Sequence, residues 1–71
     1  MTDAQYSIGD KVSAKWQIGM TFDPPLIGVV VHRAYIPTFD WLYRVQVDGK
    51  DVVINVPEAA LTLIEKVKVI E

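Results

Sequence analysis

Four aromatic residues have the types and positions to form a ligand-binding pocket: Trp16, Tyr35, Phe39 and Trp41. They fall at the ends of expected strands or in the connection between them. Aromatic faces that converge on a pocket bind cationic groups, worth roughly 1–2 kcal/mol per contact when water is excluded. The competing interpretation is that Trp16, Trp41 and Tyr43 alternate into the core and fill it. Phe39 then has the best claim to exposure.

The sequence contains few of the residues that a catalytic or metal site needs. The chain has no cysteine and a single histidine, His32, whereas a nucleophilic triad or a zinc site needs several such groups to converge with carboxylates. The four glycines lie far apart, as turn and bend glycines do, and form no phosphate-cradling motif. Asp48 and Asp51 flank an expected turn and are explained by turn chemistry. We therefore expect no enzymatic activity, no metal and no cofactor.

Residues 17–25 predict an unusually apolar connection. A glycine and a Pro-Pro pair oppose a regular ladder or helix there, so we predict a loop about nine residues long. Its apolar side chains either close one end of the core or form a patch that another subunit covers. Together with two residues expected on the outer face of a hairpin, they form the candidate self-association surface: Ile18, Met20, Phe22, Leu42 and Val53.

The elements that position these residues are most clearly marked in residues 41–56. Two runs rich in β-branched and aromatic residues flank Asp48 and Gly49, a pair that accepts positive φ at both centres of a type I′ turn. A two-residue loop there gathers one wholly apolar face, whereas a three-residue loop would scatter the apolar side chains over both faces. We therefore predict a β-hairpin with these facing pairs: Trp41 with Val56, Tyr43 with Ile54, and Val45 with Val52.

The alternation of apolar and polar residues, together with the prolines, indicates where the other strands and connections lie. Residues 11–16 alternate strictly between apolar and polar, which predicts a half-buried first strand. Residues 27–34 predict a second strand, in which Gly28 allows a bend or a close approach of another backbone. Residues 35–40 connect that strand to the hairpin, and Pro37 blocks continued pairing.

Two outcomes compete after the hairpin. Proline at position 57, followed by good helix formers, permits a helix with an amphipathic stripe. The alternative is a single 3₁₀ turn at residues 57–60 followed by a last strand at residues 61–65. Residues 66–71 are β-prone and predict a tail strand, and residues 1–5 predict a loose N-terminus.

The order of strand, long loop, strand, short loop, hairpin, short turn and strand resembles an SH3-like small barrel of the Tudor and KOW kind. Residues 6–12, 28–30, 43–45 and 56–61 carry this resemblance and span most of the chain. It implies an all-β fold over residues 1–71: an SH3-like five-stranded small barrel with one short 3₁₀ turn before the last strand. The resemblance thus favours the turn and strand over the helix.

Such barrels bind peptides, modified side chains, nucleic acid or copies of themselves, so the fold does not select a function. Tudor-like domains use aromatic cages for methylated Lys or Arg, which gives the aromatic residues a ligand class. KOW-like barrels bind RNA, which keeps an RNA-binding alternative open.

A second, narrower resemblance rests on residues 9–12, 53–54 and 59–61, which are similar to the plasmid-borne type II dihydrofolate reductases. Those enzymes are SH3-like barrels that assemble as tetramers around one pore lined by a Val-Gln-Ile-Tyr segment. The matching positions here are residues 52–55, where Val53 replaces the family's Gln and Asn55 its Tyr, and one residue is inserted before the Ala-Ala-Leu. The resemblance therefore implies the fold and a tendency to oligomerise. The polar groups that hold folate and nicotinamide are missing, so we expect no reductase turnover.

Length and composition favour association. A 71-residue chain makes one domain and buries too little apolar area to offset chain entropy by a wide margin. Small proteins gain stability from disulfides, a structural metal or a partner, and the first two have no residues to form them here. With 51% hydrophobic residues, burial between subunits is the remaining source. We expect a homo-oligomer, with a protein or peptide partner as a further option.

Charge and hydropathy argue against other partners. A net charge of −2 and a pI near 5.2 oppose non-specific binding to nucleic acid, even if Lys11, Lys15, Arg33 and Arg44 share a small basic face. The N-terminus lacks the pattern of a secretory signal. The longest apolar run, residues 26–31, is far shorter than the roughly 20 residues that span a bilayer. We expect a soluble cytoplasmic protein without a nucleic-acid or membrane partner.

Overall fold

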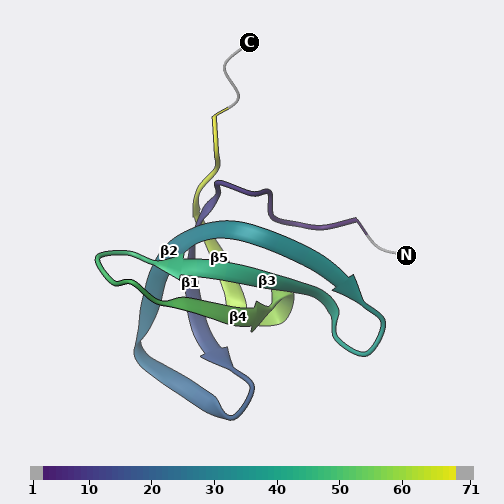
Figure 1. The fold of residues 1–71 in the computed structure, drawn as a ribbon, viewed down its shortest axis with the longest axis horizontal. Coiled ribbons are helices and arrows are strands. Elements are labelled where there is room, and N and C mark those ends of the chain that lie inside the picture. The colour runs from purple at the N-terminus through teal and green to yellow at the C-terminus, as the bar shows by residue number, and fades with distance from the viewer. Residues whose placement is uncertain (1–2, 69–71) are drawn as a thin grey trace.

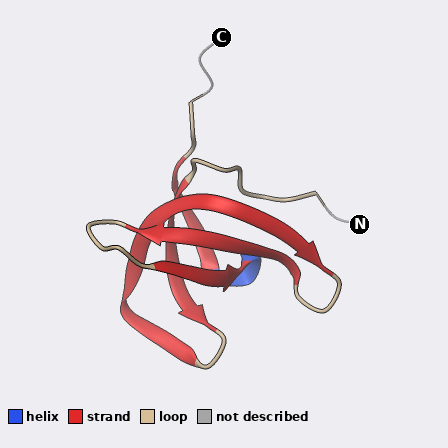
Figure 2. Ribbon diagram, in the orientation of Figure 1, coloured by secondary structure: helices blue, strands red, loops and turns tan. Residues whose placement is uncertain are grey.

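A computed structural model describes residues 3–68 as one antiparallel sheet of five strands. The strand order is β4-β3-β2-β1-β5, and the sheet curls so that β1 contacts β4 without pairing with it (Figures 1 and 2). The strands β4 and β5 are the two edges of the sheet. The elements in chain order are β1 (Lys11–Gln17), β2 (Met20–Ile36), β3 (Asp40–Val47), β4 (Val53–Pro57), the 3₁₀ turn η1 (Glu58–Ala60) and β5 (Leu61–Glu65).

This architecture confirms the predicted all-β class and the short turn before the last strand. Glu58–Ala60 form η1, and Leu61–Glu65 continue directly as β5 beside β1. Pro57 stays in an extended conformation ahead of the turn, so the chain bends once and returns to the sheet. The helix that the sequence also permitted does not form.

The predicted loop at residues 17–25 is wrong. Gln17 pairs with Met20, so the turn contains only Ile18 and Gly19, and β2 runs for 17 residues through the Pro-Pro pair. The pairing then jumps from Trp16 with Thr21 to Ala14 with Leu26, which leaves residues 22–25 bulged opposite a single residue of β1. Prolines are tolerated there because a bulge requires no ladder hydrogen bond from them.

The predicted hairpin between β3 and β4 forms, but its register is wrong. Tyr43 pairs with Val56 and Val45 with Ile54, two places away from the expected partners. The Val47 N–H donates to the Val52 carbonyl at 2.9 Å, which encloses a four-residue loop in which Gly49 has positive φ. Because side chains alternate with a period of two, an offset of two keeps the same face apolar.

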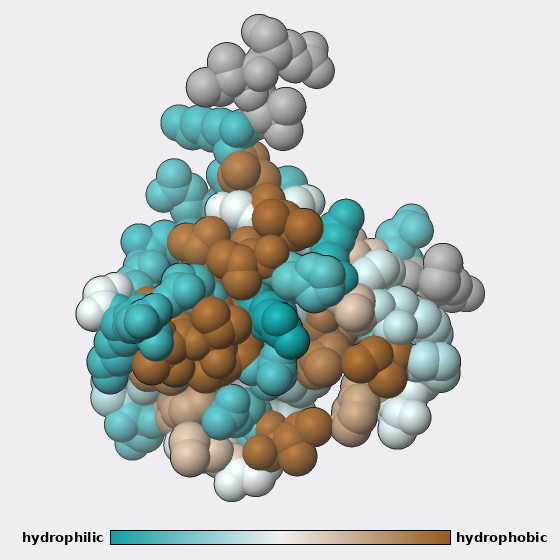
Figure 3. All heavy atoms as spheres, in the orientation of Figure 1, coloured by the Kyte–Doolittle hydropathy of each residue, from teal (hydrophilic) through white to brown (hydrophobic). Residues whose placement is uncertain are grey.

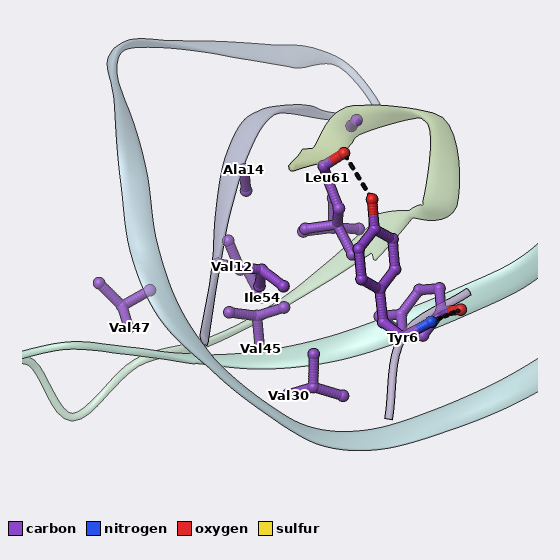
Figure 4. Close-up of a cluster of buried hydrophobic side chains, with 11 residues drawn as sticks. Tyr6, Val12, Ala14, Val30, Val45, Val47, Ile54 and Leu61 are labelled. Carbon is purple, nitrogen blue, oxygen red and sulfur yellow. Dashed lines mark hydrogen bonds between the residues drawn. The ribbon is translucent and has the colours of Figure 1, made fainter. Parts of the chain in front are cut away.

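The core lies on the concave side of the sheet, where most side chains of the predicted apolar face gather (Figure 4), but Val52 lies outside the ladder and is exposed. Tyr6, which precedes β1, stacks edge-on against Tyr43 with ring centroids 5.3 Å apart and donates its hydroxyl to the Leu61 carbonyl at 2.9 Å. No sequence pattern predicted that Tyr6 would pack in the core. The core residues are Tyr6, Val12, Ala14, Val30, Tyr43, Val45, Val47, Ile54, Val56, Ala60 and Leu61.

The carboxylate of Asp10 is fully buried, and it links the segment before β1 to the segment after β5. It accepts hydrogen bonds from the N–H groups of Ser7 at 2.9 Å and Val67 at 2.8 Å, and it pairs with the Lys66 ammonium at 3.4 Å. The sequence suggested only a Gly-Asp turn at this place. Burial alone would raise the pKa of Asp10, but these hydrogen bonds and the Lys66 charge outweigh burial and lower the pKa.

The ends of the described chain differ from the expectation. Ala4 packs against the core, and the Gln5 N–H donates to the Glu58 carboxylate at 3.1 Å, so the N-terminal segment is held more closely than its polar sequence suggests. At the other end β5 stops at Glu65, and residues 66–68 belong to no strand. Positions 69–71 of the predicted tail strand lie outside the described residues.

Candidate functional site

The convex face of β2, β3 and β4 carries a row of polar side chains across three strands. His32 pairs with Arg44 across the β2–β3 ladder, and Arg44 pairs with Asn55 across the β3–β4 ladder. All three are exposed, and their side chains make no hydrogen bond or ion pair with other described residues. The row follows from alternation along β3, where Tyr43 and Val45 point into the core and Arg44 must point outward.

Two hollows flank this polar row, and both are lined by apolar side chains as well as by the row itself. One hollow, with a volume of about 490 Å³, adds Val31 and Val53 to the row. The other adds Ala34, Ile36 and Leu42. Val31 reaches the first hollow because the ladder shifts between Val30 and His32, which turns an extra residue outward. We call the polar row and its two hollows the outer face.

The β1–β2 hairpin is a second exposed apolar feature. Its tip presents Ile18 and Met20, whose exposures are 63% and 54%. The hairpin extends away from the rest of the sheet (Figure 1), and hydrophobic surface appears at the matching lower end of Figure 3. Phe22, the third predicted member of this segment, packs against the core instead. We call Ile18 and Met20 the hairpin tip.

The five predicted self-association residues thus divide into separate places. Ile18 and Met20 lie at the hairpin tip, whereas Leu42 and Val53 lie on opposite sides of the polar row of the outer face. Leu42 is half-buried and Val53 is exposed. Because of the two-place offset of the hairpin register, Leu42 pairs with Pro57 and Arg44 pairs with Asn55.

The predicted aromatic pocket is brought together only in part. Tyr35 and Trp41 pair across β2 and β3 with their rings edge-on, 5.7 Å between centroids. The Arg33 guanidinium lies 5.8 Å from the centre of the Trp41 ring and donates to the Tyr6 carbonyl at 2.6 Å. A cation of the protein itself therefore already occupies a position over the Trp41 ring.

The other two candidate aromatics do not join that pair. Phe39 lies in the turn between β2 and β3, 44% exposed, and lines a shallow hollow with Asp40 and Glu58. Trp16 lies near the end of β1, 39% exposed, and makes no ring contact with the other aromatics of the described chain. The prediction that Phe39 is the most exposed of the four is confirmed.

Glu58 joins the 3₁₀ turn to the core through a tyrosine. The Tyr43 hydroxyl donates to the Glu58 carboxylate at 2.5 Å, and the same oxygen accepts the Gln5 N–H. Burial first, and then the hydrogen bond to the neighbouring carboxylate, raise the pKa of Tyr43 to about 12. The contact between Tyr43 and Glu58 holds η1 and the N-terminal segment on the sheet, and this structural role explains the pair.

The predicted basic face is divided among internal contacts. Lys11 pairs with Asp48 at 3.3 Å, and Arg33 turns towards Tyr6 and Trp41. Of the four basic residues considered, Lys15 and Arg44 are the two without a bond to another described residue. They lie on different strands, β1 and β3, so the four predicted residues form no shared basic face.

Other kinds of site find no support in the part of the chain that the structure describes. No three histidine or acidic side chains come close enough there to hold a metal ion. Within the same residues, no helix has the length and hydropathy to cross a bilayer. Comparisons with family models, with curated proteins and with solved structures gave no match.

Proposed function

We propose that the chain is an SH3-like small barrel that acts without catalysis as an interaction module and associates with copies of itself. The observation that carries this proposal is the amount of apolar surface outside the core: twelve large hydrophobic side chains between residues 3 and 68 are exposed. A monomer of this size has little reason to leave so many in water. The absence of cysteine from the sequence fits a reducing cytoplasm as the place of action.

Energetic considerations support an interface that uses several of these side chains. Burying one aliphatic side chain completely is worth about 1.5–3 kcal/mol, and less from partial exposure. Association costs about 4–15 kcal/mol in lost translational and rotational freedom. A pair of side chains such as the hairpin tip is therefore too small to hold two copies together, and four or more must contribute.

We expect the purified chain to sediment as a dimer or larger assembly at tens of micromolar, with a concentration-dependent mass. The reason is that apolar surface removed from water between copies supplies stability that the small core lacks. Sedimentation equilibrium over a wide concentration range measures this directly. A constant monomer mass throughout that range would contradict self-association.

A second candidate function is binding of a cationic ligand by aromatic residues, as in Tudor-like domains. The paired rings of Tyr35 and Trp41, with Phe39 exposed in the adjoining turn, favour it. The Arg33 guanidinium near the Trp41 ring weighs against it, because a ligand cation would have to displace that contact. RNA binding has less support, since the basic residues are spread over different surfaces and partly paired.

Tryptophan fluorescence separates these alternatives. A ligand cation over Trp41 should change the emission in a titration with methylated ammonium compounds, whereas an oligonucleotide should act only if nucleic acid binds. We expect no saturable response to either, because Arg33 already occupies the ring and the net charge of the chain is −2. A saturable response that the Trp41→Phe variant loses would establish the aromatic site.

A further inference from the structure

The hairpin tip and the outer face have complementary shapes. The tip projects from the sheet and carries two exposed aliphatic side chains (Figure 1). The outer face is hollowed on both sides of its polar row, and each hollow has apolar walls. A projection and a hollow on the same chain can meet only between two copies, because β1–β2 and the convex side of β3 and β4 are parts of one continuous sheet.

Charge favours pairing of the two different surfaces over pairing of the outer face with itself. Neither hollow of the outer face is lined by a carboxylate, and Arg44 has no acidic partner among the described residues. Stacking two outer faces would bring the Arg44 guanidinium of one copy towards that of the other, and like charges in contact are unfavourable.

The hairpin that bears the tip also bears an unpaired carboxylate. Asp23 is exposed in the bulge of β2 and forms no ion pair with another described residue, Lys15 of the opposing strand included. Asp23 therefore complements Arg44, while Ile18 and Met20 complement the apolar walls of the hollows. Asp23 and Arg44 each lack a charged partner within one copy, and each gains one when two copies associate.

We propose that the chain assembles head to tail: the hairpin tip of one copy docks on the outer face of the next, with Asp23 beside Arg44. This inference rests on the proposed self-association and specifies how it occurs. An interface between two different surfaces is heterologous, so each copy offers one free tip and one free face, and the assembly closes into a ring or extends as a filament.

Two variants that each destroy one half of the interface test this arrangement. Met20→Lys places a cation on the tip, and Val53→Lys adds one to the outer face; both native side chains are about half exposed, so the fold should persist. Each variant alone should sediment as a monomer. Mixed in equal amounts, they should form dimers and nothing larger, because the intact tip of one variant fits the intact face of the other.

Exchanging the charges of Asp23 and Arg44 tests the contact between them independently. Asp23→Lys and Arg44→Glu should each weaken association about tenfold, the effect of losing one interfacial pair and gaining a repulsion. An equal mixture of the two should recover most of the loss, because one interface then keeps the native pair and the next has the reversed one.

Ile64→Lys is the matched control, since Ile64 on β5 is as exposed as Val53 but belongs to neither surface. It should leave the assembly unchanged, and circular dichroism should show the same fold for all variants. If the wild-type chain assembles but the Lys variants fail to complement each other, the head-to-tail arrangement is wrong while self-association stands. If the wild-type chain is a monomer, self-association itself is wrong.

Discussion

Replacing Gly28 with alanine is expected to remove most of the stability of the fold. A β-carbon at this position would lie 2.2 Å from the Gln46 carbonyl oxygen and 2.8 Å from a Val45 methyl group. The first neighbour is backbone of β3 and the second is a buried core side chain of the same strand, so neither can move without displacing β3. We expect a loss of about 3 kcal/mol or more, a large part of what a domain of this size has. Thermal unfolding should then begin at least about 12 °C lower.

Gly19→Ala is the control for this prediction. Gly19 lies in the turn between β1 and β2, and nothing would lie within 4 Å of a β-carbon placed on it. Its positive φ of 83° costs an alanine about 1–2 kcal/mol, without any steric clash. If the two variants lose equal stability, or if Gly28→Ala is tolerated, the close contact between β2 and β3 does not exist as described.

Gly28 shows which part of the fold could be predicted from local sequence. A glycine inside a β-prone run suggested a close approach, and the approach of β3 to β2 confirms it. The alternating residues of β1 and β3 likewise predicted which side chains point inward, and Val12, Ala14, Tyr43 and Val45 are buried as expected. Alternation is a property of each strand by itself, so it needs no knowledge of the neighbours.

The register of the β3–β4 hairpin depends on contacts that local sequence does not contain. Asp48 and Gly49 do lie at the centre of a tight turn, which the Lys50 N–H closes by donating to the Val47 carbonyl at 3.2 Å, but only Gly49 of the two has positive φ, and the ladder resumes only at Val53. The Asp48 N–H donates to the Ile27 carbonyl and its carboxylate pairs with Lys11, both on other strands. The Gln46 side chain then donates to the carbonyls of Lys50 and Val52, which satisfies the wider loop. A two-residue turn was chosen from sequence because those partners lie elsewhere in the chain.

The sequence indicated some apolar residues of the candidate site but not its polar row. Ile18, Met20, Leu42 and Val53 were predicted as self-association residues, a role that stays a prediction, and Leu42 is half-buried while the other three are exposed. The polar row between Leu42 and Val53 depends on the true register. The role of Val31 depends on a ladder shift in β2 that no motif indicates. Pairing between strands is set by the whole sheet, and single-strand patterns therefore identify faces without identifying neighbours.

The largest effect that sequence patterns failed to indicate is at Asp10. We expect Asp10→Asn to destabilise the fold by about 1–3 kcal/mol at neutral pH. An amide has one acceptor oxygen, so its NH₂ group must face one of the N–H donors of Ser7 or Val67 and leave that donor unsatisfied in a buried place. The variant also loses the ion pair with Lys66. Urea unfolding at pH 7 measures the loss.

The same substitution should change how stability depends on pH. The pKa of Asp10 in the folded chain is lowered from its ordinary value of 3.8, because the hydrogen bonds of Ser7 and Val67 and the Lys66 charge outweigh burial. A lowered folded pKa means that the carboxylate stabilises the fold fully above pH 3.8, and that this contribution is lost as the pH falls through the folded pKa.

The difference in unfolding free energy between wild type and Asp10→Asn should therefore be constant from pH 7 to about pH 5 and shrink below pH 4. Taking the difference cancels the other carboxylates, which titrate in both proteins. Asp51→Asn, at an exposed acidic residue of the hairpin loop, should show neither the loss at neutral pH nor the convergence in acid. A difference that stays constant down to pH 2 would mean that Asp10 has the same pKa in the folded and the unfolded chain, and that Ser7, Val67 and Lys66 do not favour its ionised form.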